Sequence, residues 1–180
     1  NRSYYALDFG KYLSLVILDS QHTNPIAGPQ ADWLAEAMSR RGDQQFLFAC
    51  YHFPAYGTTK EPEGGTPIDS PQALAIQKNW CPSFERYGAT AIFENDHHNY
   101  KRSHRIRNRQ RDDANGILYL GDGAWGVEPR EVPKDAWWLA KADGRNHLWH
   151  VELDPNGKVE FEAIDAEGEA GLALRVAVRP

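Results

Sequence analysis

Residues Phe93 to Ser103, FENDHHNYKRS, place carboxylate, amide and imidazole groups directly after a short apolar run that begins at Ala89. The apolar run predicts a buried strand, so these polar groups lie where a strand ends and a loop begins, a frequent position for functional residues. Asp96 and His98 are two residues apart, and on an extended backbone such residues point to the same side. This spacing would let both side chains bind one metal ion or two neighbouring ions.

A second histidine follows another apolar run. Residues Phe46 to Tyr51 predict a buried strand, and His52 comes directly after it. If the two strands are neighbours in one sheet, His52 and His98 meet at the same edge. His22 lies in a loop after a third predicted strand, where it either lines the same edge or faces solvent.

The remaining pattern predicts a mixture of helices and strands. Prolines in a first turn, apolar residues at helical spacing and glycine stops indicate helices, whereas apolar runs bounded by turn residues indicate strands. We expect a mixed α/β fold with helices outside a strand-rich centre. The expected elements are a hairpin of Tyr4–Phe9 and Tyr12–Leu18, helices at Pro29–Met38, Ser70–Trp80 and Pro82–Tyr87, a strand at Ile117–Leu120, and a hairpin of His147–Leu153 and Val159–Ile164.

The composition indicates a single globular segment over residues 1–180. Apolar residues make up 41% of the chain, which suffices for a substantial core. No apolar run approaches the roughly 20 residues that span a bilayer. The net charge of −5 gives no overall attraction to nucleic acid or to an anionic membrane, so neither is expected as a partner.

Three further segments, which are polar and lie outside the expected helices and strands, carry expectations of their own. The loop Tyr56–Asp69 directly follows His52 and is expected to form one wall of a cleft, because long loops in compact domains are usually functional. Lys101–Arg111 contains six basic side chains; a nucleic-acid arm is one interpretation, but alternation of basic and uncharged residues favours a solvated hairpin. Ala124–Gly144, rich in tryptophan, proline and charge, is expected to pass over the cleft, and no chemistry is expected in the tail from Ala166.

The order of these motifs resembles the second half of a calcineurin-like metallophosphoesterase, and most closely the purple acid phosphatases. The matching features are a buried strand followed by His52-Phe53-Pro54, a strand that ends in the loop Asn95–Ser103, and Gly121-Asp122-Gly123. The resemblance extends over about Tyr4 to Leu153. It implies that the chain is the C-terminal half of a four-layer αββα sandwich, whose absent N-terminal half would be its partner.

The resemblance also implies a binuclear metal site. In such a site two ions, of Fe, Zn or Mn, clamp a phosphate ester and supply a metal-activated hydroxide that attacks it. His52 would bind one ion and His98 the other, with Asp96 joining His52, and Asp96 and His98 would be the catalytic residues. The residues expected to contact the phosphate ester are Tyr100, Arg102 and His22. The residues expected to orient the metal ligands are Asn95 and Asp122.

Two departures from the family pattern affect this site. An aspartate stands at position 96 where the first of two paired histidines is expected, and His97 stands next to it. Either Asp96 is the ligand or, with the segment shifted by one residue, His97 is. The family's Asp-x-His, Gly-Asp and Gly-Asn-His motifs, which supply the other half of the site, are not found as an ordered set in this chain.

The leading hypothesis is therefore a metal-dependent phosphoesterase that acts on phosphomonoesters or phosphodiesters. The alternative is a non-catalytic binding domain on a degenerate phosphatase fold. Because about half of the ligands are missing, the 180 residues alone are expected to be inactive. The resemblance further implies an extracytoplasmic or secreted location.

Overall fold

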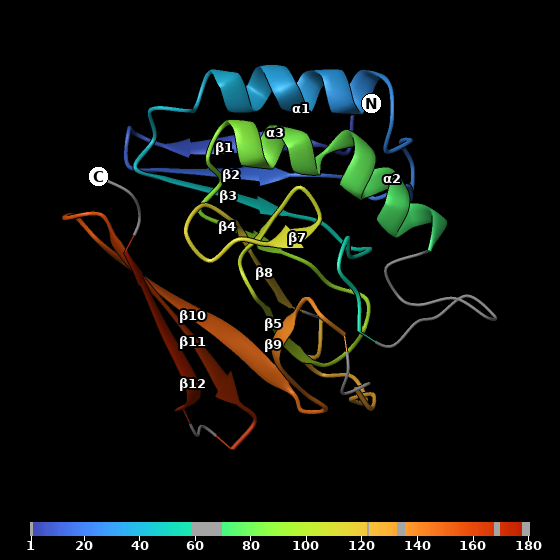
Figure 1. Ribbon diagram of the computed structural model, residues 1–180, viewed down its shortest axis with the longest axis vertical. Helices are drawn as coiled ribbons and strands as arrows, with labels where there is room; N and C mark the ends of the chain where they lie inside the picture. The colour runs from blue at the N-terminus through green and yellow to red at the C-terminus, as the bar shows by residue number, and fades with distance from the viewer. Residues whose placement is uncertain (1, 59–69, 122, 133–135, 168–169, 178–180) are drawn as a thin grey trace.

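The computed structural model describes residues 2–58, 70–121, 123–132, 136–167 and 170–177. These residues form a seven-stranded mixed sheet with the strand order β1-β2-β3-β4-β8-β5-β9, a three-stranded sheet and a short two-stranded hairpin. Figure 1 shows the helices along one side of the large sheet and the three-stranded sheet on the other side. The mixed α/β class expected from the sequence is confirmed.

Four adjacent strands of the large sheet run parallel. These are β2 (Leu13–Ile17), β3 (Phe46–Cys50), β4 (Ala91–Phe93) and β8 (Leu118–Gly121). Antiparallel strands flank them: β1 (Tyr5–Phe9) pairs with β2, and β5 (Tyr100–Ser103) pairs with β8 and with the edge strand β9 (Leu139–Asp143). The remaining strands are β6 (Ile106–Arg107), β7 (Gln110–Arg111), β10 (His147–Asp154), β11 (Lys158–Asp165) and β12 (Ala170–Ala177).

Three helices cover one face of the large sheet. Helix α1 (Pro29–Ser39) begins with a proline in its first turn, and the Ser70 hydroxyl caps α2 (Pro71–Asn79) by accepting a hydrogen bond from the Ala73 amide at 3.1 Å. Helix α3 (Cys81–Arg86) follows α2 after a break. The core beneath the helices includes Leu34 and Met38 of α1, Ile76 of α2, Phe84 of α3, and Val16, Leu47, Ala49, Ile92 and Tyr119 of the sheet.

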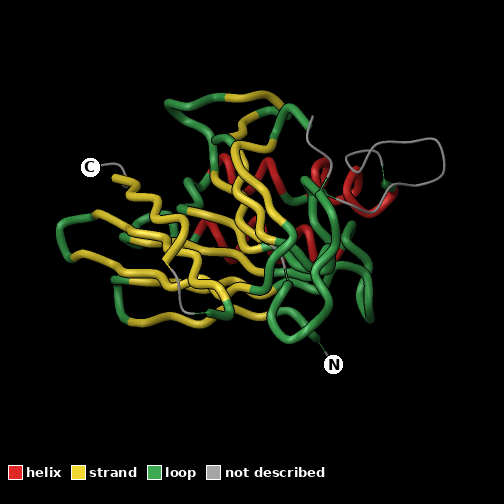
Figure 2. Tube along the Cα trace, turned by 90° about the horizontal axis from the view of Figure 1, so that it is seen from below, coloured by secondary structure: helices red, strands yellow, loops and turns green. Residues whose placement is uncertain are grey.

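The opposite face packs against the three-stranded sheet. Phe161 and Val159 of β11 lie against Phe48 and Phe46 of β3, and all four side chains are buried. Figure 1 shows the three-stranded sheet as a separate layer, and in Figure 2, seen from below, strands lie in front of the helices. The described residues therefore form three layers, with helices, large sheet and small sheet in that order.

The outer end of this second face is uncovered. Tyr5, Leu7 and Phe9 alternate along β1 and point to one face, and they are exposed to 50%, 46% and 53%. Their register partners Ile17, Leu15 and Leu13 on β2 are only half-buried. Together these six residues, Tyr5, Leu7, Phe9, Leu13, Leu15 and Ile17, form an apolar β1–β2 face.

Most expected elements are confirmed, and three strands were not expected. One is β5, which lies between β8 and β9 although Asn95–Ser103 was expected to be a loop. Strand β9 lies inside the segment expected to be an excursion over the cleft, and β12 lies in the tail to which no structure was assigned. Both are edge strands of their sheets, and β9, with the sequence Leu-Ala-Lys-Ala-Asp, lacks the continuous apolar run by which a buried strand is recognised. The solvated hairpin of the basic segment is confirmed as β6 and β7, but Lys101, counted among its basic residues, is 0% exposed.

Two further expectations concern the cleft loop Tyr56–Asp69 and membrane-spanning helices. Of the expected cleft loop, Tyr56 to Thr58 are described and buried, and residues 59–69 lie outside the described part of the chain. The described helices include none with the length and apolar character needed to cross a membrane.

Candidate functional site

The carboxyl ends of the four parallel strands lie at one edge of the sheet, and the loops after them carry the candidate residues. His22 follows β2, His52 follows β3, and Asp96 follows β4. The strand pairing continues past the strand ends, because the Asn95 amide donates a hydrogen bond of 2.9 Å to the His52 carbonyl. Asp122 follows β8 and lies outside the described residues.

His52 and Asp96 are in direct contact. The Nε2 atom of His52 lies 3.1 Å from Oδ1 of Asp96. The histidine side chain is 46% exposed and the aspartate side chain 9% exposed, so the carboxylate is buried and the imidazole is accessible from solvent. The fold thus brings together two residues that are 44 positions apart in the sequence.

His22 lies against His52. The centroids of the two imidazole rings are 4.9 Å apart, and the His22 ring also stacks on Phe53 at 4.9 Å with an interplanar angle of 12°. The contact with His52 places His22 at the same sheet edge. Its role in substrate binding stays a prediction, because ring contacts do not identify a ligand.

The Asp19 carboxylate organises the loop that carries His22. It accepts hydrogen bonds from the Ser3 and Thr23 hydroxyls, from the His22 amide at 2.7 Å and from the Asn24 amide at 2.9 Å. Burial by itself would raise the pKa of Asp19, but these hydrogen bonds outweigh burial and hold the pKa well below its ordinary value. Asp19 is therefore an ionised carboxylate that fixes the start of this loop.

His97 is buried beside Asp96. Its Nδ1 atom accepts a hydrogen bond of 2.7 Å from the Thr58 amide, and its Nε2 atom lies 3.9 Å from Oδ2 of Asp96. Asp96 thus has one imidazole near each carboxylate oxygen, His52 at Oδ1 and His97 at Oδ2.

The turn that presents Asp96 and His98 is held in an uncommon backbone conformation. Asp96 has φ 83° and His98 has φ 56°, in the left-handed region where aspartate and histidine occur more often than most residues. Such residues cost on the order of 1–3 kcal/mol each, so surrounding contacts must maintain them. Arg130 supplies two contacts, because its amide donates to the His98 carbonyl at 3.0 Å and its Nη1 donates to the Asp96 carbonyl at 3.2 Å.

Asn95 and a glycine also support this turn. The Asn95 side chain donates a hydrogen bond of 2.8 Å to the Tyr51 carbonyl, one residue before His52. A Cβ atom at Gly123 would lie 3.0 Å from the Asp96 amide nitrogen, and Gly123 itself has φ 73°. The Gly-Asp-Gly motif recognised in the sequence therefore permits the β8 loop to approach Asp96 closely.

Two residues expected to contact substrate lie on β5. Tyr100 is fully buried, with its ring centroid 5.4 Å from those of both His147 and Trp149. Burial raises the pKa of Tyr100 to about 12, so the phenol stays protonated at neutral pH. Arg102 is half-buried on the same strand.

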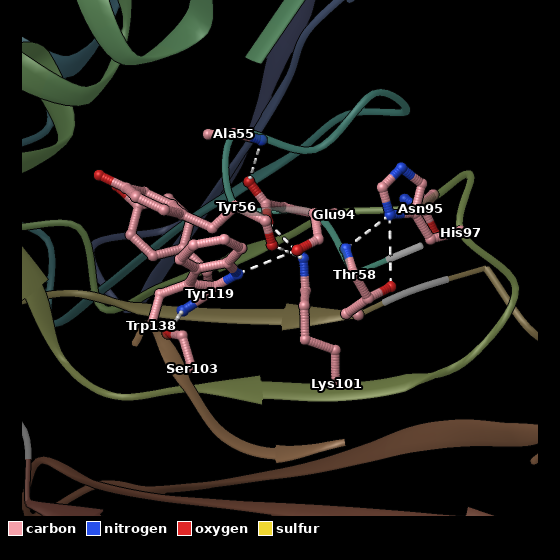
Figure 3. Close-up of polar contacts among 12 residues, drawn as sticks. Ala55, Tyr56, Thr58, Glu94, Asn95, His97, Lys101, Ser103, Tyr119 and Trp138 are labelled. Carbon is pink, nitrogen blue, oxygen red and sulfur yellow. Dashed lines mark hydrogen bonds and ion pairs between the residues drawn. The ribbon is translucent and has the colours of Figure 1, made fainter. Parts of the chain in front are cut away.

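A buried ion pair that the sequence did not reveal lies next to the site. Lys101 Nζ donates to Glu94 Oε2 at 2.5 Å and to the Tyr56 carbonyl at 2.8 Å, and both charged side chains are 0% exposed (Figure 3). Glu94 Oε1 accepts from the Tyr51 hydroxyl at 2.7 Å and from the Ala55 amide at 2.7 Å. Glu94 directly follows β4 and Lys101 is the second residue of β5, so the pair closes the base of the loop that carries Asp96.

Among the residues that the structure describes, no group of three histidine, cysteine or carboxylate side chains is arranged to hold a metal ion. The His52–Asp96 pair supplies two donors of the kinds that Mn, Fe and Zn bind. Further ligands would have to come from outside this pair. A cavity of about 750 Å³ lies elsewhere, between residues 129–132 and β9, and the described residues that line it include none of the candidates.

Comparison with solved structures identifies the fold. Over 97% of this chain, the structure resembles purple acid phosphatase PPD1 from yellow lupin (Lupinus luteus) seeds, with a TM-score of 0.81 and 16% sequence identity. It also resembles GAP50, the anchor in the inner membrane complex of Plasmodium, over 98% of this chain with a TM-score of 0.72 and 10% identity. No protein-family model matches the sequence, and no curated protein matches it.

The chain spans 32% of the length of the lupin phosphatase and 55% of GAP50. The expected resemblance to a purple acid phosphatase is thereby confirmed for the fold, and the coverage fits a C-terminal fragment of that fold. The sequence identities are too low to transfer an activity from either protein.

Proposed function

We propose that this chain is part of a metal-dependent phosphoesterase in which His52 and Asp96 share one metal ion. The observation that carries the proposal is the 3.1 Å contact between His52 Nε2 and Asp96 Oδ1 at the carboxyl edge of the parallel strands. Binding sites in such sheets lie outside the carboxyl ends of the strands. The phosphatase-like fold supports the same reaction class.

The His52–Asp96 geometry fits two ligands of one ion. Nitrogen and oxygen ligands lie about 2.1 Å from Zn and similar ions, so two neighbouring ligands of one ion are ~3.0–3.4 Å apart. The observed contact falls in this range. Because a carboxylate replaces an imidazole at position 96, we infer a preference for Mn or Fe over Zn at this ion.

His98 is proposed as a ligand of a second ion. It shares the turn that presents Asp96, and Arg130 holds the backbone of that turn at both residues. Two bound ions would supply Lewis-acid polarisation of a phosphate ester and lower the pKa of water. The residues of this chain would orient that site, with His22, Arg102 and Tyr100 proposed to act on the substrate and Asp122 and Asn95 on the ligands.

The other ligands are proposed to come from a further half of the same domain. The described residues contain no group of three ligands, and the chain spans only 32% of the lupin phosphatase. The apolar β1–β2 face is exposed beside the three-stranded sheet, where a continuation of that second layer would cover it. An exposed apolar face of a β-sheet is usually buried by a second sheet that packs on it.

The test compares metal content and kcat/KM for p-nitrophenyl phosphate in variants of the full-length protein. Asp96→Ala and His98→Ala should each lower kcat/KM by orders of magnitude, whereas Asp96→His should retain much of it by restoring the family's imidazole. His97→Ala separates the two registers: it should abolish one binding site if His97 is the ligand, whereas both sites should persist if Asp96 is the ligand. The 180 residues alone should show negligible turnover; chelator-sensitive turnover by them would refute the divided site.

A second candidate is a non-catalytic binding domain on the same fold. GAP50, which is described as an anchor, has this fold at a TM-score of 0.72, and position 96 here departs from the family's ligand pattern. Full-length protein that contains no metal after purification in Mn, Fe and Zn, and that hydrolyses no phosphate ester, would select this candidate.

A further inference from the structure

The segment Ala55–Thr58, three residues after His52, is buried and held by side chains rather than by strand pairing. Its polar groups bond as follows: Ala55 N with Glu94 Oε1 at 2.7 Å, Ala55 O with Gln77 Nε2 at 2.7 Å, Tyr56 O with Lys101 Nζ at 2.8 Å, Gly57 O with Trp138 Nε1 at 2.9 Å, and Thr58 N with His97 Nδ1 at 2.7 Å. Three of these five partners belong to the loop Glu94–Lys101, so the segment fixes the loop that carries Asp96 (Figure 3).

The Thr58 contact determines which nitrogen of His97 carries the proton. A ring nitrogen that accepts a hydrogen bond from a backbone amide has no proton of its own. The Thr58 hydroxyl is engaged by Asn99, to which it donates at 3.0 Å and from which it accepts at 2.8 Å. In neutral His97 the proton is therefore on Nε2, the nitrogen that faces Oδ2 of Asp96 at 3.9 Å.

Gly57 provides the space that the His97 ring occupies. A Cβ atom at position 57 would lie 2.3 Å from His97 Cε1 and 2.9 Å from Nδ1, closer than any real contact of this kind. Gly57 does not have a positive φ, so its conformation does not require glycine, and the imidazole is what excludes a side chain. The ring is 5% exposed, which leaves it little room to move away.

We infer that His97 is a positioning residue for Asp96 and does not itself bind metal. Gly57 and Thr58 hold the ring and its proton so that Nε2–H faces Oδ2, which leaves Oδ1 turned toward His52. The inference rests on the proposed function in one respect, that Asp96 is a ligand. It assigns to His97, Gly57 and Thr58 a role in orienting the Asp96 carboxylate.

The matched variants His97→Asn and His97→Gln separate the two contacts. The asparagine amide occupies the place of Nδ1 and keeps an acceptor for Thr58, whereas the glutamine amide occupies the place of Nε2 and keeps a donor toward Asp96. We measure the affinity of the metal-free full-length protein for Mn²⁺ by titration calorimetry, with urea unfolding as a check that both variants fold. His97→Asn should weaken binding roughly 10–100-fold, and His97→Gln should retain affinity within about threefold.

Gly57→Ala tests the same contact from the opposite side. Alone it should weaken Mn²⁺ binding as much as His97→Asn does, and together with His97→Asn it should add little, because both changes act through one ring. A loss of one bound ion per protein in both His97 variants would show that His97 is a ligand and overturn the inference. Equal affinities of His97→Asn and the unaltered protein would also overturn it.

Nitrogen-15 NMR of the unaltered full-length protein tests the inference without metal. The His97 ring should be the Nε2–H tautomer, and Asp96→Asn should shift the Nε2 resonance. An Nδ1–H tautomer refutes the positioning role even in an active phosphoesterase. If the protein binds no metal, the proposed function fails, and the tautomer and its response to Asp96→Asn still decide whether His97 positions Asp96.

Discussion

Replacement of Lys101 by methionine tests the buried ion pair that closes the Asp96 loop. Lys101 and Glu94 are both 0% exposed, and the ammonium group donates to the Glu94 carboxylate at 2.5 Å and to the Tyr56 carbonyl at 2.8 Å. Methionine fills much of the same space but supplies no charge and no donor. The substitution therefore leaves a buried carboxylate and a buried carbonyl without their cation.

The expected cost follows from that burial. Removal of one partner of a buried ion pair costs about 3–5 kcal/mol, because the remaining charge stays out of water. The Glu94 carboxylate keeps the hydrogen bonds from the Tyr51 hydroxyl and the Ala55 amide, which places the expected loss near the lower end, at about 3 kcal/mol. That is a large share of the ~5–15 kcal/mol by which a typical domain is stable.

The assay is urea unfolding followed by tryptophan fluorescence, with Lys141→Met as the matched control. Lys141 lies on β9, pairs in register with Arg102 and is exposed, so its replacement should change the free energy of unfolding by no more than ~0.5 kcal/mol. The double variant Glu94→Gln/Lys101→Met should lose less than the sum of the two single variants, because the first change removes the charge that the second leaves unpaired.

A loss below about 1 kcal/mol for Lys101→Met, equal to that of Lys141→Met, would refute the reasoning. It would mean that Lys101 reaches solvent in solution and that the pair does not close the loop. Strict additivity in the double variant would likewise show that the two side chains do not interact.

Two further predictions concern the loop that carries His22 and the packing of the two sheets. Because the pKa of Asp19 is lower in the folded state than its ordinary ~3.9, its stabilisation is present above that value and is lost as the pH falls through the folded-state pKa. The difference in unfolding free energy between the unaltered protein and Asp19→Ala should thus be constant from about pH 7 to 5 and shrink below about pH 4; a difference unchanged at lower pH contradicts this. Phe161→Ala removes a 0% exposed ring between the sheets and should cost about 3–5 kcal/mol in urea unfolding, whereas a loss below about 1 kcal/mol would mean that the small sheet is not docked.

Local patterns determined most of the elements and the strand ends that carry the site. Apolar runs bounded by turn residues predicted β2, β3, β4 and β8, because strands in the middle of a sheet with layers on its two faces are largely apolar. Prolines and a serine cap predicted the starts of α1 and α2, since those residues act within a single helical turn. The expectation that His52 lies at the same sheet edge as the Asp96–His98 turn followed from the carboxyl ends of neighbouring parallel strands.

Only the tertiary structure decided how the side chains at that edge are arranged. The His52–Asp96 contact and the packing of His97 on Gly57 depend on two loops, 40 or so positions apart, that meet after the strands have paired. The Glu94–Lys101 pair is local in sequence, but its backbone partners Ala55 and Tyr56 also come from the earlier loop. Lys101 appeared in the sequence as one of six basic residues, and nothing local distinguishes a lysine that finds a buried carboxylate from one in solvent. Sequence patterns predict which segments are buried and where strands end. The partners of buried polar groups are fixed only when distant segments pack together, and the candidate site consists of such partners.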